Sequence, residues 1–158
     1  MSNKEIISFI ERYTDEIWNG GNLDKLSEFV GDTYVEHNSY GDIEGLDGFR
    51  QFVAMTLEGF PDFKVTIDNC ISQGELLGYT YVAEGTHEQD YGGLAPTGNR
   101  ATVDGCFLAR LEDGKLVEGW NQFDLMGLMV QLEAMGQPEG LETGTEEQFQ
   151  TGATGRPG

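Results

Sequence analysis

Residues 102–124 read TVDGCFLARLEDGKLVEGWNQFD and decide the fold, because they carry two strand patterns joined by one tight turn. The runs Thr102–Leu111 and Leu116–Asp124 have the length and the composition of β-strands. Asp113-Gly114 between them is a strong signal for a hairpin turn. The segment therefore predicts a pair of antiparallel strands.

The length of this turn decides which side chains lie opposite one another. A two-residue loop places Val103 beside Asp124, whereas a three-residue loop places Thr102 there. Asp104 changes face with that choice, and we therefore leave it out of the candidate site.

Two more strand patterns precede this hairpin. Phe63, Val65 and Ile67 alternate with polar residues, as in a strand with one wet face. The run Leu76–His87 follows the turn signal Gln73-Gly74. Together the four runs predict an antiparallel meander.

Helical patterns occupy the first part of the chain. Apolar side chains recur at spacings of three and four within residues 3–18, in a short segment over residues 22–30, and over Leu46–Gly59. Between them Tyr34–Asn38 reads as a short extended piece, followed by a polar, glycine-containing loop. Leu125–Met135 predicts a short closing helix.

This order of elements predicts the α+β fold class. We expect the N-terminal helices to pack in the concave face of a curved, mainly antiparallel sheet, so that the whole forms a cone-shaped α+β barrel. A chain of 158 residues has the size of one compact domain, which we place at residues 1–136. Residues 137–158 are rich in glycine and threonine, and we expect a disordered acidic tail.

The chain is strongly acidic, because 28 acidic and 9 basic side chains give a net charge of −19. Such a field repels nucleic-acid phosphates and anionic lipids, so we expect neither a nucleic acid nor a membrane as partner. Scarce lysine among many carboxylates is typical of halophilic proteins, whose self-repulsion concentrated salt screens; an acidic protein from an ordinary organism is the alternative. No signal peptide or membrane-spanning run is evident, and we expect a cytoplasmic location.

Several kinds of active site are disfavoured because their motifs are missing. Cys70 and Cys106 form neither a C-x-x-C pair nor part of a histidine cluster, which argues against zinc and redox sites. A G-x-S-x-G motif is absent, and Gly92-Gly93 lacks the strand-turn-helix setting of a phosphate loop. We therefore expect no cofactor and no metal.

Asp124 is the first candidate for catalysis. By the period of two, it shares one strand face with Trp120 and Gln122. A carboxylate beside an indole on the concave side would be partly desolvated, which raises its pKa and suits a general base. The residue pattern alone favours a simpler role, in which Asp124 caps the helix that follows.

Histidines and aromatic residues complete the candidates. His87 ends the strand that carries Tyr81 on the same face, so it lies either at the rim of a cavity or in a structural hydrogen bond to a loop. His37 has the same two interpretations. Tyr13 and Phe52 fit the core best, although some core aromatics can line a cavity.

Four stretches stand out together: IERYTDEIWNGGNLDKLSEFVGDTYVEHN, LDGFRQFVAMTLEGFPDFKVTI, GTHEQDYGGLAPTG and LEDGKLVEGWNQFDLMGLMVQLEAMG. In combination they resemble the SnoaL-like polyketide cyclase family, also called ester cyclases, within the superfamily that shares the fold of nuclear transport factor 2. The resemblance covers roughly residues 5–136.

The resemblance implies that Asp124 acts as general acid/base for an intramolecular aldol ring closure and that His87 lies in the pocket, where a histidine can polarise a carbonyl. No metal or redox cofactor is needed, because a base removes a proton beside a carbonyl, the enolate attacks a second carbonyl, and pocket donors stabilise the oxyanion. With Asp124 and His87 as catalytic residues, we assign substrate binding to His37, Tyr81, Trp120, Gln122, Tyr13 and Phe52.

Two functions remain open from the sequence. The first is a cofactor-independent cyclase or isomerase that acts on a small apolar carbonyl compound. The second is a non-catalytic binder or dimeric scaffold, because a fold does not fix a function. We expect a homodimer in either case, since the outer face of the sheet carries apolar side chains that a monomer leaves wet.

Overall fold

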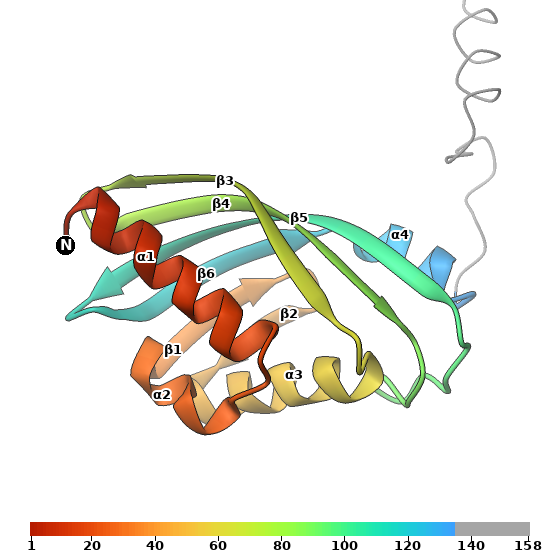
Figure 1. The fold of residues 1–158 in the computed structure, drawn as a ribbon. Coiled ribbons are helices and arrows are strands. Elements are labelled where there is room, and N and C mark those ends of the chain that lie inside the picture. The colour runs from red at the N-terminus through yellow and green to blue at the C-terminus, as the bar shows by residue number, and fades with distance from the viewer. Residues whose placement is uncertain (135–158) are drawn as a thin grey trace, which may run out of the picture.

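A computed structural model describes residues 1–134 of the chain (Figure 1). Its elements are, in chain order, the helix α1 (Asn3–Tyr13), the π-helical turn η1 (Thr14–Trp18), the 3-10 turn η2 (Leu23–Lys25), the helix α2 (Leu26–Phe29), the strands β1 (Val30–Asn38) and β2 (Gly41–Glu44), the helix α3 (Gly45–Gly59), the strands β3 (Lys64–Gln73), β4 (Leu76–Thr86), β5 (Arg100–Glu112) and β6 (Lys115–Phe123), and the helix α4 (Leu125–Gln131). The predicted tail over residues 137–158 lies outside the described residues.

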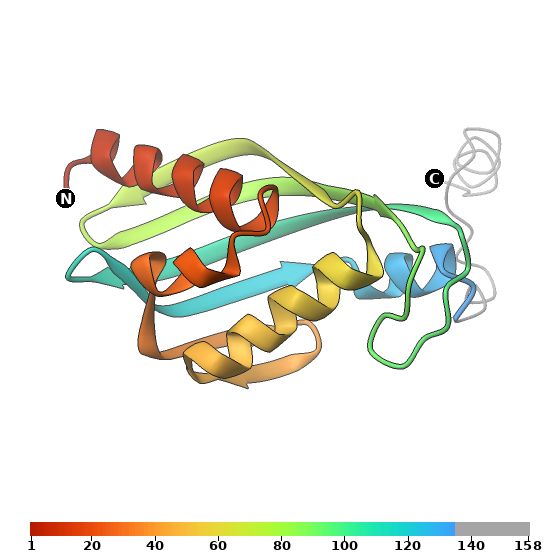
Figure 2. The same ribbon diagram turned by 60° about the horizontal axis from the view of Figure 1, so that its bottom comes forward.

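The strands form one curved sheet in the order β2-β1-β6-β5-β4-β3. All neighbours are antiparallel except β1 and β6, which run parallel, so the sheet is mixed and mainly antiparallel. Figures 1 and 2 show α1, α2 and α3 on the concave side of the sheet, while α4 follows β6 at one end. The predicted α+β class and the packing of the N-terminal helices are confirmed, and the sheet does not close on itself.

The first helix begins and ends for identifiable reasons. Ser2 and Glu5 form a capping box, in which each side chain bonds the other residue's backbone N–H. One face of α1 buries Ile6, Phe9, Ile10 and Tyr13, as the helical spacing predicts. The chain then continues as the π-helical turn η1.

Close packing against the sheet depends on a glycine of β6. A Cβ atom at Gly119 would overlap the hydroxyl oxygen of Tyr34 and would lie 2.8 Å from the Phe107 ring. Tyr34 is fully buried and packs edge-on against Phe49 of α3, with ring centroids 5.0 Å apart. Gly119 therefore lets an aromatic layer approach the backbone of the sheet.

Residues 22–44 contain more strand than the sequence pattern predicted. The short second helix is only a 3-10 turn followed by a four-residue helix, and Val30 already begins β1. The polar loop after Asn38 turns back as β2. Val30 was wrongly placed in the helix because its contacts come from β6, more than eighty residues later in the chain.

The β5–β6 hairpin has the predicted turn but an unpredicted register. Glu112 pairs with Lys115 across the two-residue turn, and an irregularity follows between Arg110 and Leu111. This β-bulge puts Asp124 opposite Asp104, whose carbonyl accepts its backbone N–H at 3.2 Å. Neither predicted pairing of Asp124 was right.

The bulge also exchanges the two faces of β6. Beyond it, Gly119, Asn121 and Phe123 face the helices, whereas Trp120 and Gln122 face away from them. A shift of one residue reverses every side chain that follows, which is why the sequence-based face assignment failed. Within residues 1–134, no helix is long and apolar enough to cross a membrane.

Candidate functional site

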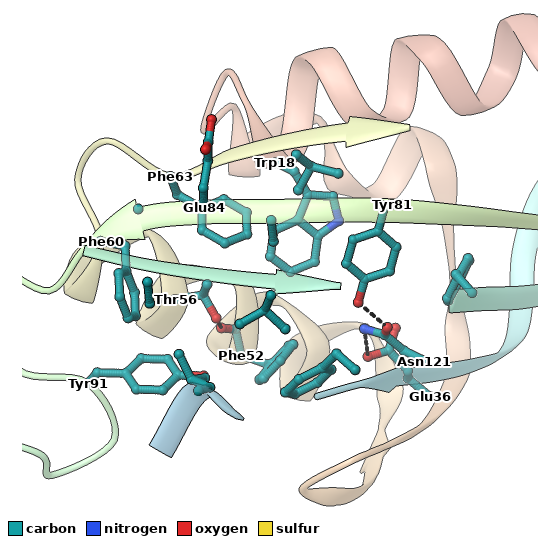
Figure 3. A pocket seen from close by; sticks show the side chains of 18 of the residues that line it. Trp18, Glu36, Phe52, Thr56, Phe60, Phe63, Tyr81, Glu84, Tyr91 and Asn121 are labelled. Atoms are coloured by element: carbon teal, nitrogen blue, oxygen red, sulfur yellow. Dashed lines mark hydrogen bonds between the residues drawn. The ribbon is translucent and has the colours of Figure 1, made fainter. Parts of the chain in front are cut away.

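A cavity of about 100 Å³ lies between the concave face of the sheet and the helices. Aromatic rings form most of its wall (Figure 3). Some come from η1, α3 and its C-terminal loop, the loop after β4, and β6: Trp18, Phe52, Phe60, Phe63, Tyr91 and Phe123. The others come from α1, β4 and β5: Tyr13, Tyr79, Tyr81 and Phe107. Such a wall suits an apolar guest of small size.

One carboxylate lies at an end of this cavity. Glu36 of β1 has only 1% of its surface exposed. Its Oε1 accepts a hydrogen bond from the Tyr34 hydroxyl at 2.9 Å, and its Oε2 accepts from Asn38 Nδ2 at 3.1 Å and from Asn121 Nδ2 at 3.5 Å. Figure 3 shows Asn121 beside Glu36, with Phe60 and Tyr91 at the other end of the view. The buried charge is therefore solvated by protein donors.

The orientation of the Asn38 amide is fixed independently. The backbone N–H of Tyr40 donates to Asn38 Oδ1 at 2.7 Å. Since a backbone N–H can only donate, the amide NH₂ of Asn38 must face Glu36. This arrangement favours the ionised carboxylate, which can only accept.

Burial and hydrogen bonding act in opposite directions on Glu36. Burial raises the pKa of its carboxyl above the ordinary value, while the bonds from Asn38, Tyr34 and Asn121 lower it. Burial has the larger effect, so the net shift of the pKa is upward. A carboxylate with a raised pKa is a stronger base than one in water.

Tyr81 extends this hydrogen-bonded group along the cavity wall. Its hydroxyl donates to Asn121 Oδ1 at 2.6 Å, as Figure 3 shows. Burial, and then the charge of Glu36, raise the pKa of Tyr81, so its hydroxyl stays protonated. Tyr81, Asn121 and Glu36 thus form a continuous polar chain inside an aromatic cavity.

Three of the predicted site residues line this cavity: Tyr13, Phe52 and Tyr81. Asp124 is not among the lining residues. Its side chain accepts from the backbone N–H of Gly127 at 2.9 Å and caps α4, as the simpler interpretation held. Asp124 and Gln122 border an open hollow on the outer face of the sheet.

His37 and Trp120 also lie on the outer face. The His37 ring stacks on the Trp120 indole at 5.5 Å and lies between Asp42, at 2.8 Å, and Glu118, at 2.9 Å. Hydrogen bonds to Glu118 and then Asp42 raise the pKa of His37. His37 and Trp120 were predicted to bind the substrate, but neither is among the residues that line the cavity.

His87 is fully buried behind the cavity wall. Its Nδ1 accepts from the backbone N–H of Thr97 at 3.3 Å, and its ring stacks on Phe60 at 5.4 Å. Nε2 has no hydrogen-bond partner among the described residues. His87 is not among the lining residues, although Phe60, against which it packs, is.

Glu36 and Asn121 were not among the site residues predicted from the sequence. Glu36 lies in a segment that reads Tyr34-Val35-Glu36-His37-Asn38, in which the apolar residues Tyr34 and Val35 are adjacent and give no alternation. The available signal was the pairing of Glu36 with Tyr34 and Asn38 at spacings of two. Those three residues share one strand face, and buried acids need such donors.

Groups of three or more His, Cys, Asp or Glu side chains placed to hold a metal ion do not occur among residues 1–134. Glu36 is held instead by two amides, those of Asn38 and Asn121, and by the phenol of Tyr34.

Comparisons with known proteins agree with this architecture. The model of the SnoaL-like polyketide cyclase family matches residues 9–132. Among solved structures, IdmH, a proposed polyketide cyclase from Streptomyces antibioticus, is 27% identical, with 80% of this chain and 96% of that chain covered and a TM-score of 0.69.

Two further structures show the same fold. A proposed SnoaL-like polyketide cyclase from Jannaschia sp. CCS1 is 24% identical, covering 84% of this chain and 94% of its own, with a TM-score of 0.76. AclR, a proposed hydroxylase from Streptomyces galilaeus, is 19% identical, covering 97% of this chain and 92% of its own, with a TM-score of 0.79. The search of curated proteins found no match. Since the family model spans most of the described residues, the chain belongs to the SnoaL-like polyketide cyclase family.

Proposed function

We propose that this protein catalyses proton transfer at a carbon beside a carbonyl group of a small apolar compound, leading to cyclisation or isomerisation. The membership of the SnoaL-like family supports the reaction class. The observation that carries the proposal is one buried carboxylate, Glu36, at the end of an aromatic cavity.

Glu36 takes the role of general base in this proposal, in place of Asp124. Asp124 is bonded to the backbone of α4 and does not line the cavity, whereas Glu36 does. The protein donors around Glu36 leave part of its acceptor capacity free, because a carboxylate has about four lone-pair sites and three are used.

The reaction needs only acid–base steps. Ionised Glu36 removes the proton from the carbon, and the electron pair moves to the carbonyl oxygen to give an enolate. In cyclisation, the enolate carbon attacks a second carbonyl of the same molecule, and the alkoxide that forms takes the proton back from Glu36. In isomerisation, the enolate takes the proton back from Glu36 at another carbon. Glu36 is ionised again at the end, so atoms and charge balance.

Hydrogen–deuterium exchange at the acidic CH₂ of β-tetralone, followed by proton NMR, tests the proposal. We expect the native protein to accelerate exchange over buffer and Glu36→Gln to lose at least about 100-fold of that acceleration, the usual contribution of a positioned base. Asp124→Asn is the matched control, since it removes a carboxylate charge outside the cavity.

The two variants separate the two candidate bases. Loss of exchange in Asp124→Asn with full exchange in Glu36→Gln would contradict the role of Glu36. Far-UV circular dichroism and thermal unfolding check that both variants fold. Glu36→Asp, which keeps a carboxylate but shortens it, should recover part of the rate lost in Glu36→Gln.

A further inference from the structure

We infer that the Tyr13 hydroxyl is the hydrogen-bond donor that receives the carbonyl oxygen of the substrate and stabilises the enolate. This inference rests on the proposed function and deepens it by naming a second catalytic group. It starts from the π-helical turn η1 at the end of α1.

The π-helical turn brings two residues of the cavity wall side by side. Tyr13 and Trp18 are five residues apart, and the wide turn Thr14–Trp18 between them closes with i to i+5 geometry. The Trp18 indole N–H bonds the Tyr13 hydroxyl oxygen at 3.2 Å. An ordinary α-helix places residues three and four apart on one face, so the π-turn is what makes this contact.

This contact fixes which way the Tyr13 hydroxyl can donate. An indole N–H is a donor only, so the Tyr13 oxygen accepts from Trp18 and its own proton remains available. Among the described residues no acceptor receives that proton, although Tyr13 is only 2% exposed and lines the cavity. Accepting one hydrogen bond also strengthens the hydroxyl as a donor.

The other hydroxyls beside the cavity are mostly committed. Tyr34 donates to Glu36, Tyr81 donates to Asn121, and the hydroxyls of Tyr40 and Tyr91 bond each other at 2.6 Å. Within residues 1–134, Tyr79 is the other cavity tyrosine whose hydroxyl makes no side-chain hydrogen bond, and no donor such as Trp18 orients or strengthens it. Tyr79 therefore serves as the comparison residue.

The charge environment suits Tyr13 to this task. Burial, and then the charge of Glu36, raise the pKa of Tyr13, so the hydroxyl keeps its proton at neutral pH. The base and the donor line one cavity, which is the arrangement that enolisation requires: one group takes the proton and another stabilises the charge that develops on oxygen. We therefore expect a substrate that carries a carbonyl oxygen, as hydrogen-bond acceptor, beside an acidic C–H group.

The test uses β-tetralone labelled with carbon-13 at the carbonyl, bound at saturation to the full-length protein. A hydrogen bond to the oxygen moves the carbonyl resonance downfield. We expect this shift with the native protein, a smaller one with Trp18→Phe, and none with Tyr13→Phe. Tyr79→Phe removes one hydroxyl from the same wall and should keep the shift.

Kinetics give the second readout. We expect Tyr13→Phe to lower the maximal exchange rate about 100-fold, with little change in the concentration for half-saturation, because the donor acts mainly as charge develops. Loss of the shift in Tyr79→Phe with its retention in Tyr13→Phe overturns the inference. So does a Tyr13→Phe variant whose shift and rate equal those of the native protein.

Failure of the inference is distinguishable from failure of the proposed function. A native protein that binds β-tetralone with a Tyr13-dependent shift, but exchanges no protons, refutes the proposed proton transfer and leaves the donor assignment standing. Exchange that needs Glu36 and not Tyr13 refutes the donor assignment and leaves the proposed function standing.

Discussion

Glu36 shows how a single buried acid links stability to chemistry. Its donors come from its own strand, through Tyr34 and Asn38, and from β6, through Asn121. Without them an ionised carboxylate at this depth would cost several kcal/mol, and the group would become neutral instead. The same donors therefore keep Glu36 available as a base.

The raised pKa of Glu36 predicts a pH dependence of stability. In the unfolded chain Glu36 titrates near its ordinary value, and in the folded chain it titrates at a higher pH. Its contribution to stability is fully present below the unfolded pKa and is lost as pH rises through the folded pKa, because the folded state then gives up a proton that it binds more tightly. The free energy of unfolding of the native protein should therefore fall, relative to Glu36→Gln, as pH rises above about 4.3.

Urea unfolding of both proteins at constant salt, from about pH 4 to about pH 8, measures this difference. All other ionisable groups are common to the two proteins, so their titrations cancel. A difference in the free energy of unfolding that is the same at every pH reflects the new amide. Only a change of this difference with pH reports on the titration of Glu36. A difference that does not vary with pH would contradict the raised pKa.

At the scale of elements, the β-bulge in the β5–β6 hairpin decides which residues reach the cavity. It places Gly119 and Asn121 inward and Trp120 outward. Because Gly119 leaves no space for a Cβ beside Tyr34 and Phe107, Gly119→Ala should destabilise the fold by about 1–3 kcal/mol through overpacking.

Gly48 of α3 provides the matched control for this substitution. A Cβ there would make only an ordinary contact, 3.6 Å from Ile43. Because alanine is the better helix former, Gly48→Ala should stabilise the protein by about 0.5–1 kcal/mol. Chemical denaturation of the two variants should therefore give changes of opposite sign, and equal changes would show that the packing at Gly119 yields.

The sequence predicted elements better than it predicted faces. The spacing of apolar residues in α1 and α3 and the Asp113-Gly114 turn led to the right helices, hairpin and fold class. The position of the bulge could not be predicted from the sequence. It depends on the packing of Leu116, before the bulge, and of Gly119, after it, since both are buried in the core. That error of one residue put Trp120 and Gln122 in the candidate site and left Asn121 out, whereas Asp124 entered the site through the family resemblance.

The pairing of β1 with β6 also could not be predicted from the sequence. This pairing is parallel and joins residues far apart in the chain, so local patterns carry no record of it. Glu36 becomes a site residue only through this pairing, which brings Asn121 within reach. A candidate site made of long-range contacts is thus harder to predict than the elements that carry it.

At the scale of the whole molecule, an apolar row crosses the outer face of the sheet. Ile71, Gly78, Leu108 and Trp120 are successive cross-strand partners. Ile71 is 74% exposed and Leu108 is 46% exposed, and both lie over Gly78. Arg110 and Glu118 flank this outer row and carry opposite charges. In a contact about a two-fold axis the same surface of both copies meets, so a surface with charges of both signs can complement itself.

We therefore predict a homodimer that buries the outer row. Its two copies are both strongly acidic, so added KCl should favour association by screening their repulsion. Sedimentation equilibrium at low and at molar KCl measures the state, and Leu108→Glu should shift it to monomer while leaving the cavity intact. A native protein that stays monomeric in molar KCl would refute this dimer.

The parallel pairing of β1 with β6 also bears on how the protein is made. Tyr13 and Glu36 leave the ribosome early, but Asn121 belongs to a strand synthesised about eighty residues later. Contacts between such distant segments form late and slow the folding of a chain, since a long loop must close first. During synthesis Glu36 therefore remains hydrated, and the cavity acquires its buried acid only when nearly the whole domain has emerged.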